Sequence, residues 1–201
     1  MDVVQMIGFI LWIVFYGSYF VKIYKEKKQG ISVNRMARGI KSLATKIVEV
    51  FLIVITYAMA VVQLLSLMFY GKWALVFQRE GVLVTSPVST VIGTIIAVLG
   101  IIFFVTAMRE MRDNWRAGID ESQETDFVTE GIYKISRNPA FVGFDLFYIG
   151  YGIIFSNGLQ VLFVLLGLMT LHMQIRQEEK YMEKKHAGSY LAYRKRVRRY
   201  L

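Results

Sequence analysis

Apolar residues dominate four long runs of this chain, at positions 3–24, 47–70, 88–108 and 140–175. An α-helix needs about 20 apolar residues to cross the hydrocarbon core of a bilayer. The first three runs have about this length, and their only charged side chains are Lys22 in the first and Glu49 in the second. A soluble domain of this size rarely carries such runs. The pattern therefore predicts an integral membrane protein.

The fourth run holds 36 residues and is too long for a single span. It is interrupted by the small polar stretch Ser156, Asn157 and Gly158, and residues of these types end one helix and begin another. We therefore predict a helical hairpin that turns at residues 156–158. The sequence then indicates an all-α fold with five transmembrane helices, a single membrane domain over residues 1–201 that ends in a helical tail.

The first run could in principle be a secretory signal peptide. Its charges begin at Lys22, after the apolar stretch, and no small-residue cleavage site is evident, so we expect a retained helix. The chain has no cysteine, which excludes disulfides, zinc–thiolate sites and thiol nucleophiles.

The distribution of charge predicts the orientation in the membrane. Of the 24 Lys and Arg residues, all but Lys72 and Arg79 lie in segments 22–46, 109–137 and 176–199. The positive-inside rule then places the N-terminus outside and the C-terminal tail in the cytosol of a multi-pass cell-membrane protein. The net charge is +9. Basic residues beside a membrane attract anionic headgroups, so the tail "RKRVRR" indicates contact with the bilayer, and we expect no nucleic-acid partner.

Side chains capable of chemistry are concentrated after residue 108. We therefore expect residues 1–108 to form a three-helix scaffold and residues 109–201 to form the cofactor-binding, catalytic half. Within the scaffold, Gly93 and Gly100 would allow close packing of the third helix.

Four elements stand out in the second half: "MRDNWRAGI" with Trp115, "TDFVTEGIYKISRNPAFVG" at 125–143, the pair Glu178 and Glu179, and the tail "HAGSYLAYRKRVRR". Each has a simple structural explanation when taken alone. Asn138 and Pro139 can be the N-cap and first residue of a helix, and two adjacent glutamates can be a solvated helix end.

In this order, and on both sides of a membrane hairpin, the four elements resemble the isoprenylcysteine carboxyl methyltransferase and phospholipid methyltransferase family. The resemblance covers about residues 108–201, and the first 100 residues match in topology only. The sequence departs from the family pattern at a few positions. Asn138 replaces a His, Phe141 a Tyr, Gln174 an Arg and Ala187 a Phe.

The resemblance implies that the cofactor is S-adenosylmethionine, with no metal ion. Its adenine needs an aromatic wall, its ammonium and ribose need a carboxylate, and its own carboxylate needs donors. Tyr133 and Phe141 would provide the wall and Glu178 the carboxylate. A helix N-terminus capped by Asn138, together with a bidentate Arg137, would provide the donors. The cofactor-binding residues carried over are Thr125, Asp126, Phe127, Val128, Tyr133, Arg137, Asn138, Pro139, Ala140, Phe141 and Glu178.

The same resemblance implies transfer of the methyl group to the carboxylate of an isoprenylated or otherwise lipidic acceptor that enters sideways from the bilayer. A carboxylate is already ionised and needs no base, so catalysis would consist mainly of alignment and exclusion of water. We expect catalytic roles for His172, Arg176 and Arg199, and contacts with the acceptor from Trp115, Asp145 and Gln174.

Two other functions remain open from the sequence. One is N-methylation of an aminophospholipid, for which His172 would be the base that removes the proton of the amine. The other is a sterol-type membrane reductase that uses NADPH, whose tail carries a similar motif on a membrane domain that is usually larger.

Overall fold

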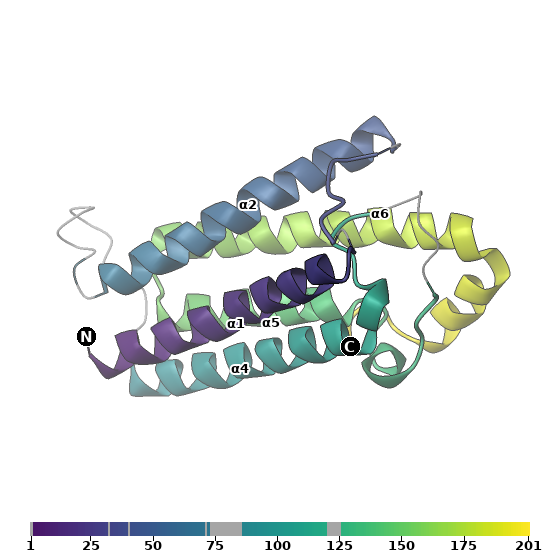
Figure 1. Ribbon diagram of the computed structural model, residues 1–201. Coiled ribbons are helices and arrows are strands. Elements are labelled where there is room, and N and C mark those ends of the chain that lie inside the picture. Colours follow the sequence, from purple (N-terminus) through teal and green to yellow (C-terminus); the bar gives the residue numbers. More distant parts are fainter. Residues whose placement is uncertain (1, 32, 40, 71, 73–85, 120–125) are drawn as a thin grey trace.

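The computed structural model describes residues 2–31, 33–39, 41–70, 72, 86–119 and 126–201. Every regular secondary-structure element in these residues is a helix (Figure 1). Apart from helices, they contain only an isolated bridge between Asn34 and Ala117. The elements are α1 (Val3–Lys28), α2 (Leu43–Met68), α4 (Pro87–Glu110), the short 3-10 helices η1 (Arg112–Asn114) and η2 (Gly131–Lys134), α5 (Pro139–Ile154) and α6 (Gly158–Arg196).

Four of these helices, α1, α2, α4 and α6, are long and apolar enough to cross a membrane, which indicates a multi-pass membrane protein. The apolar part of α6 ends at Ile175, so the polar residues from Arg176 onward lie outside the predicted span. α5 has only 16 residues, about 24 Å at 1.5 Å per residue, and is shorter than a bilayer core of about 30 Å. The structure therefore supports four of the five predicted spans.

The helix boundaries follow from local capping signals. Asp2 and Ser86 each form a capping box, at the start of α1 and α4. Ser42 accepts a hydrogen bond from the Thr45 N–H, so α2 begins four residues before its predicted start. α5 ends at Ile154 and α6 begins at Gly158, so the helix is interrupted at the polar stretch where the sequence predicted it. There Asn157 caps α6 by accepting from the Gln160 N–H.

α6 bends near its C-terminal end. Ala187 has a φ of 33°, which lies in the left-handed region and interrupts the helix. Beyond this point the chain turns back toward the rest of the molecule, as the yellow segment of Figure 1 shows. The bend returns Tyr190 and Tyr193 to the body of the protein, where both are buried.

α4 and α5 pack with their backbones in close contact, through glycines on both helices. A Cβ added to Gly100 would lie 2.5 Å from the Phe147 nitrogen and 2.7 Å from the Gly143 oxygen. The same closeness recurs at Gly93, whose added Cβ would lie 2.6 Å from the Gly150 oxygen. Small residues at these positions allow two helices to approach within lipid.

Because the atoms that crowd Gly100 belong to the backbone, we expect Gly100→Ala to force α4 and α5 apart. Overpacking of this kind destabilises by about 1–3 kcal/mol, measured as a lower melting temperature of the purified protein. The matched control is Gly17→Ala on α1, where nothing lies within 4 Å of the added Cβ and alanine is the better helix former by about 1 kcal/mol. Equal losses in the two variants would contradict close packing of α4 on α5.

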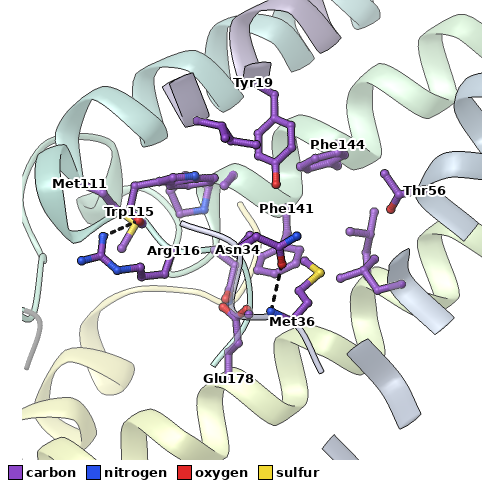
Figure 2. Close-up of a pocket in the computed structure, with 18 of the residues that line it drawn as sticks. Tyr19, Asn34, Met36, Thr56, Met111, Trp115, Arg116, Phe141, Phe144 and Glu178 are labelled. Carbon is purple, nitrogen blue, oxygen red and sulfur yellow. Dashed lines mark hydrogen bonds between the residues drawn. The ribbon is translucent and has the colours of Figure 1, made fainter. Parts of the chain in front are cut away.

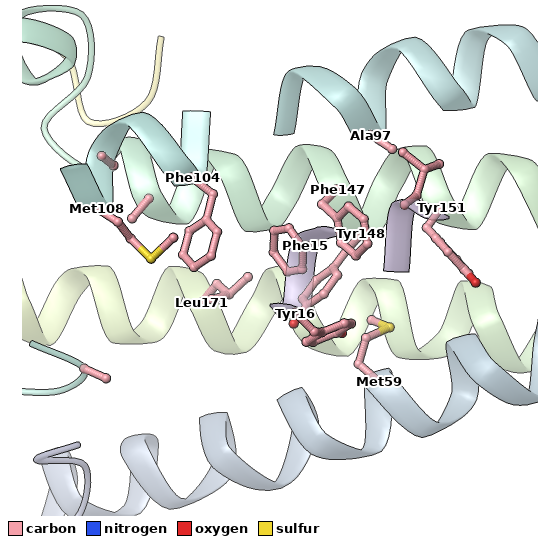
Figure 3. Packing of buried hydrophobic residues seen from close by; sticks show 14 of the residues in the cluster. Phe15, Tyr16, Met59, Ala97, Phe104, Met108, Phe147, Tyr148, Tyr151 and Leu171 are labelled. Carbon is pink, nitrogen blue, oxygen red and sulfur yellow. The ribbon is translucent and has the colours of Figure 1, made fainter. Parts of the chain in front are cut away.

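The core between the helices is largely aromatic. The ring of Phe15 on α1 stacks on Phe147 of α5, with centroids 3.8 Å apart, and Phe104 of α4 packs against the other side of this cluster (Figure 3). Polar side chains link α2 to the same cluster, because Tyr16 Oη donates to Gln63 Oε1 at 2.9 Å. Two residues of this core, Phe15 and Tyr16, also line the cavity described next.

Candidate active site

A cavity of about 530 Å³ lies between α1, α2, the start of α5 and α6 (Figure 2), within the range typical of small-molecule sites, roughly 300–1,000 Å³. Its walls differ in chemical character. One wall consists of residues 126–128 and 137–141 together with Glu178, and is rich in polar groups. The other extends between α1 and α2 and is formed mainly by apolar and aromatic side chains: Trp12, Phe15, Tyr16, Tyr19, Phe20, Ile23, Leu52, Ile53, Thr56, Tyr57, Ala60, Val61 and Leu64.

Glu178 contributes a carboxylate to the polar wall. Its Oε1 accepts a hydrogen bond from Gln174 Nε2 at 3.1 Å, and its other oxygen has no hydrogen-bond partner in the part of the chain that the structure describes. Burial raises the pKa of the Glu178 carboxyl to about 7, although the hydrogen bond from Gln174 lowers it. A cation that enters the cavity would therefore stabilise the ionised form of this carboxyl.

Glu179, the next residue, is bound by the protein itself. Its carboxylate accepts from Arg137 at 2.8 Å and from Arg199 at 2.8 and 3.0 Å. Burial raises the pKa of Glu179, but the hydrogen bonds from Arg199 and Arg137 outweigh it and hold the pKa below its ordinary value. Glu179 is therefore an ionised carboxylate between two guanidinium groups.

The prediction that the Asn138 side chain caps α5 is wrong. Its amide donates to Glu179 Oε1 at 3.4 Å and to the Arg199 carbonyl at 3.1 Å, and no side-chain hydrogen bond caps this helix. The ion cluster around Glu179 therefore takes the amide away from the helix. As a consequence, the N–H groups of Ala140 and Phe141 at the start of α5 have no hydrogen-bond partner among the described residues, and both residues line the cavity.

The Arg137 guanidinium already binds other parts of the protein. Its guanidinium donates to Glu179 Oε1, to the Val197 carbonyl at 2.6 Å and to the Arg194 carbonyl at 3.4 Å. These contacts use three of the five guanidinium N–H groups, and the buried Nε has no hydrogen-bond partner among the described residues. The bidentate contact with a cofactor carboxylate that the resemblance implies therefore stays a prediction.

The last residues of the chain are attached to the start of α5. The Arg137 N–H donates to the Arg198 carbonyl at 2.9 Å, and Ser136 Oγ donates to the Arg199 carbonyl at 3.1 Å. Arg199, a predicted catalytic residue, belongs to this attachment and does not line the cavity.

The remaining predicted site residues divide into two groups. Four of the other predicted acceptor and catalytic residues do not line the cavity. His172 bonds to Tyr200 Oη at 2.6 Å, Gln174 donates to Glu178, and Arg176 is exposed. One buried oxygen of Asp145 has no hydrogen-bond partner among the described residues. Thr125 lies outside the described residues. The predicted residues that line the cavity are Trp115, Asp126, Phe127, Val128, Tyr133, Arg137, Asn138, Pro139, Ala140, Phe141 and Glu178.

Several cavity residues come from the first half of the chain, which the sequence had assigned to a scaffold. α1 and α2 supply the apolar wall, and the loop between them supplies Asn34 and Met36. Glu49, fully buried, holds this loop in place: it accepts from the Ala37 N–H at 2.7 Å, the Ile119 N–H at 2.9 Å and Lys41. A single carboxylate in an otherwise apolar run was the available signal, since such residues usually have a specific partner or function.

The sequence of this chain is similar to those of known proteins. Residues 88–188 match the sequence profile of the family described as phospholipid methyltransferase. The Protein-S-isoprenylcysteine O-methyltransferase of Saccharomyces cerevisiae is 29% identical over 111 residues, which are 54% of this chain and 46% of the yeast protein, so the match spans less than half of that protein's length. The profile covers half of the chain and includes all of α4 except Pro87, all of α5 and the whole polar wall. This chain belongs to the phospholipid methyltransferase family.

Proposed function

We propose that this protein transfers the methyl group of S-adenosylmethionine to the carboxylate of a lipid-like acceptor. The observation that carries the proposal is one cavity with two chemically different parts. One part is the polar wall, with the Glu178 carboxylate and the uncapped N-terminus of α5. The other is the space beside the apolar wall of α1 and α2, which we call the apolar arm. The polar wall suits a charged cofactor and the apolar arm suits a hydrocarbon chain.

The polar wall fits S-adenosylmethionine by the chemistry of its groups. The Glu178 carboxylate would bind a cationic group or the ribose hydroxyls, because one of its oxygens is open to a ligand. The uncapped N–H groups of Ala140 and Phe141, at the positive end of the α5 dipole, would bind a carboxylate. Phe127 and Tyr193, whose rings meet edge to face at 5.3 Å, offer an aromatic surface for a purine. When bound, the cofactor supplies a methyl group activated by a sulfonium.

The apolar arm supports a lipidic acceptor. Phe20 on α1 and Tyr57 and Val61 on α2 line the arm and are each more than half exposed, so the arm is open between the two helices. A hydrocarbon chain can enter there directly from the bilayer. The yeast relative is named for an S-isoprenylcysteine acceptor, and an isoprenyl chain matches the apolar character of the arm.

A carboxylate suits this cavity better than an amine as the methyl acceptor. An amine must lose a proton to a base, and neither described histidine is placed to take it. His172 is bonded to Tyr200 and His186 stacks on Phe127 at 5.0 Å, while the cavity walls of the described chain contain no histidine. An ionised carboxylate needs only orientation and the exclusion of water.

The direct test uses the purified protein in detergent or nanodiscs. Calorimetric titration should show binding of S-adenosylmethionine and no binding of NADPH. Labelled S-adenosylmethionine should then transfer its methyl group to an N-acetylated S-isoprenylcysteine in preference to an aminophospholipid. Binding of NADPH alone would identify a reductase, and methylation of the aminophospholipid alone would reject the carboxylate acceptor.

We further propose that α5 crosses the bilayer as a fifth span, with the N-terminus outside and the C-terminal tail in the cytosol, because 22 of the 24 Lys and Arg residues lie in the segments assigned to the cytosolic side. Gly158 at the α5–α6 turn and Gly188 beyond the bend are well suited to labelling, since neither has an atom within 4 Å of an added Cβ. In intact cells, a membrane-impermeant thiol reagent should label Gly158→Cys and not Gly188→Cys. The reverse pattern would invert the topology.

A further inference from the structure

We propose that Tyr19 of α1 binds the polar head of the methyl acceptor, donating a hydrogen bond from its hydroxyl to the acceptor carboxylate. The proposal rests on the function proposed above and adds to it a residue that selects an oxygen acceptor. It also gives the N-terminal half of the chain a direct part in recognition of the acceptor.

Tyr19 lies where the two chemically different parts of the cavity meet. Its side chain comes from α1, which forms the apolar arm, and its hydroxyl points into the cavity toward Phe141 at the start of α5 (Figure 2). In the same view Glu178 approaches from the opposite side. An acceptor whose chain fills the arm would therefore bring its polar head to the Tyr19 hydroxyl, facing the groups that suit the cofactor.

The position of the Tyr19 ring is fixed by packing. Its centroid lies 6.2 Å from that of Phe104, a ring with no exposed surface. Phe104 also contacts Phe144, with centroids 4.8 Å apart, and Trp115, at 6.0 Å. With Phe15, whose ring centroid lies 5.0 Å from that of Phe104, Tyr19 is thus one of four aromatic side chains held on a single buried ring, and this packing orients its hydroxyl before any ligand binds.

The polar atoms of this cluster lack partners. The Tyr19 hydroxyl makes no hydrogen bond with any described residue, and the Trp115 indole N–H is buried without one. An indole N–H can only donate, and a tyrosine hydroxyl donates readily. In a cavity open to hydrocarbon, two donors without partners favour a ligand that presents an oxygen acceptor, and a carboxylate is the strongest such acceptor.

A hydroxyl at this place also accounts for one departure from the family pattern. Phe141 stands where that pattern has Tyr, so its ring carries no hydroxyl. Because the Tyr19 hydroxyl points toward Phe141 (Figure 2), α1 supplies to this part of the cavity the group that residue 141 lacks. Moving the hydroxyl from residue 19 to residue 141 should then preserve much of its function.

The test is Tyr19→Phe, assayed with an N-acetylated S-isoprenylcysteine and labelled S-adenosylmethionine. Loss of one hydrogen bond to a charged group should lower kcat/KM for the acceptor by about tenfold to a hundredfold. The affinity for S-adenosylmethionine, measured by calorimetry, should stay unchanged. The double variant Tyr19→Phe, Phe141→Tyr should recover part of the lost kcat/KM, which a merely structural role of Tyr19 would not predict.

Tyr24→Phe is the matched control, because Tyr24 lies on the same helix, is exposed and does not line the cavity. It should retain the wild-type kcat/KM. Three outcomes overturn the proposal: an unchanged kcat/KM in Tyr19→Phe, a parallel loss of cofactor affinity, or a wild-type protein that methylates the amine of an aminophospholipid in preference to the carboxylate. A wild-type protein that binds no S-adenosylmethionine would instead reject the proposed function itself.

Discussion

Glu178→Gln should weaken the binding of S-adenosylmethionine by roughly 2–5 kcal/mol, the usual loss when one partner of a buried charge pair is removed. The substitution keeps the size of the side chain and can keep the hydrogen bond from Gln174 to Oε1, so the cavity should retain its shape. What it removes is the negative charge on the polar wall. Calorimetric titration measures the loss directly, and an equal affinity in the two proteins would show that Glu178 does not contact the cofactor.

The same residue predicts a dependence on pH. Because the pKa of Glu178 is raised to about 7, lowering the pH through 7 protonates it in the free protein, and a protonated carboxyl does not attract a cation. The affinity for the cofactor should therefore fall by up to about tenfold per pH unit below 7. In Glu178→Gln this dependence should be absent, which separates it from the titration of any other group.

The effect of Glu178 on stability has the opposite sign. Its ordinary pKa is 4.5 and its pKa in the folded protein is about 7, so between these values the folded state binds more protons than the unfolded state. The stability of the free protein that comes from this group is present below pH 4.5 and is lost as the pH rises toward 7. A carboxyl kept at such a cost in stability is typical of a binding site.

The features that could be predicted from the sequence are those encoded by local signals. Long apolar runs define α1, α2 and α4. The thickness of the bilayer sets the number of apolar residues that a spanning helix needs, and this number can be counted directly in the sequence. The polar stretch before Gly158 breaks the last run where Asn157 caps α6. One of the four elements that carry the family resemblance, at 125–143, likewise lies in one segment, and its residues 126–128, 133 and 137–141 line the cavity together.

The features that the sequence missed depend on contacts between distant segments. Asn138 has the composition and position of an N-cap, and its amide leaves that role because Arg199, 61 residues later, brings a carbonyl within 3.1 Å. The apolar arm was missed for another reason. Residues of α1 and α2 that face a cavity, such as Leu52, are of the same type as those that face lipid, and hydrophobicity does not distinguish them.

Glu179→Ala should have the opposite profile from Glu178→Gln, with its main effect on folding. Its carboxylate lies between Arg137 and Arg199, whose side chains are 7% and 34% exposed. Removing one partner of a buried ion pair destabilises by about 3–5 kcal/mol, because the remaining charges stay buried without compensation. The partial exposure of Arg199 lets water screen part of that charge, so we expect about 3 kcal/mol, read as a lower melting temperature.

Glu179 also lines the cavity beside Glu178, and its loss should loosen the C-terminal segment. Without the carboxylate, Arg199 is held at the start of α5 by its carbonyl alone, which accepts from Asn138 and Ser136. The double variant Glu179→Ala, Arg199→Ala should then lose less unfolding free energy than the losses of the two single variants added together, because each single change already breaks their shared contact. Strict additivity would mean that the two charges do not stabilise each other. If Glu179→Ala melts like the wild type and loses only cofactor affinity, the two adjacent glutamates have the reverse of the roles that their contacts indicate.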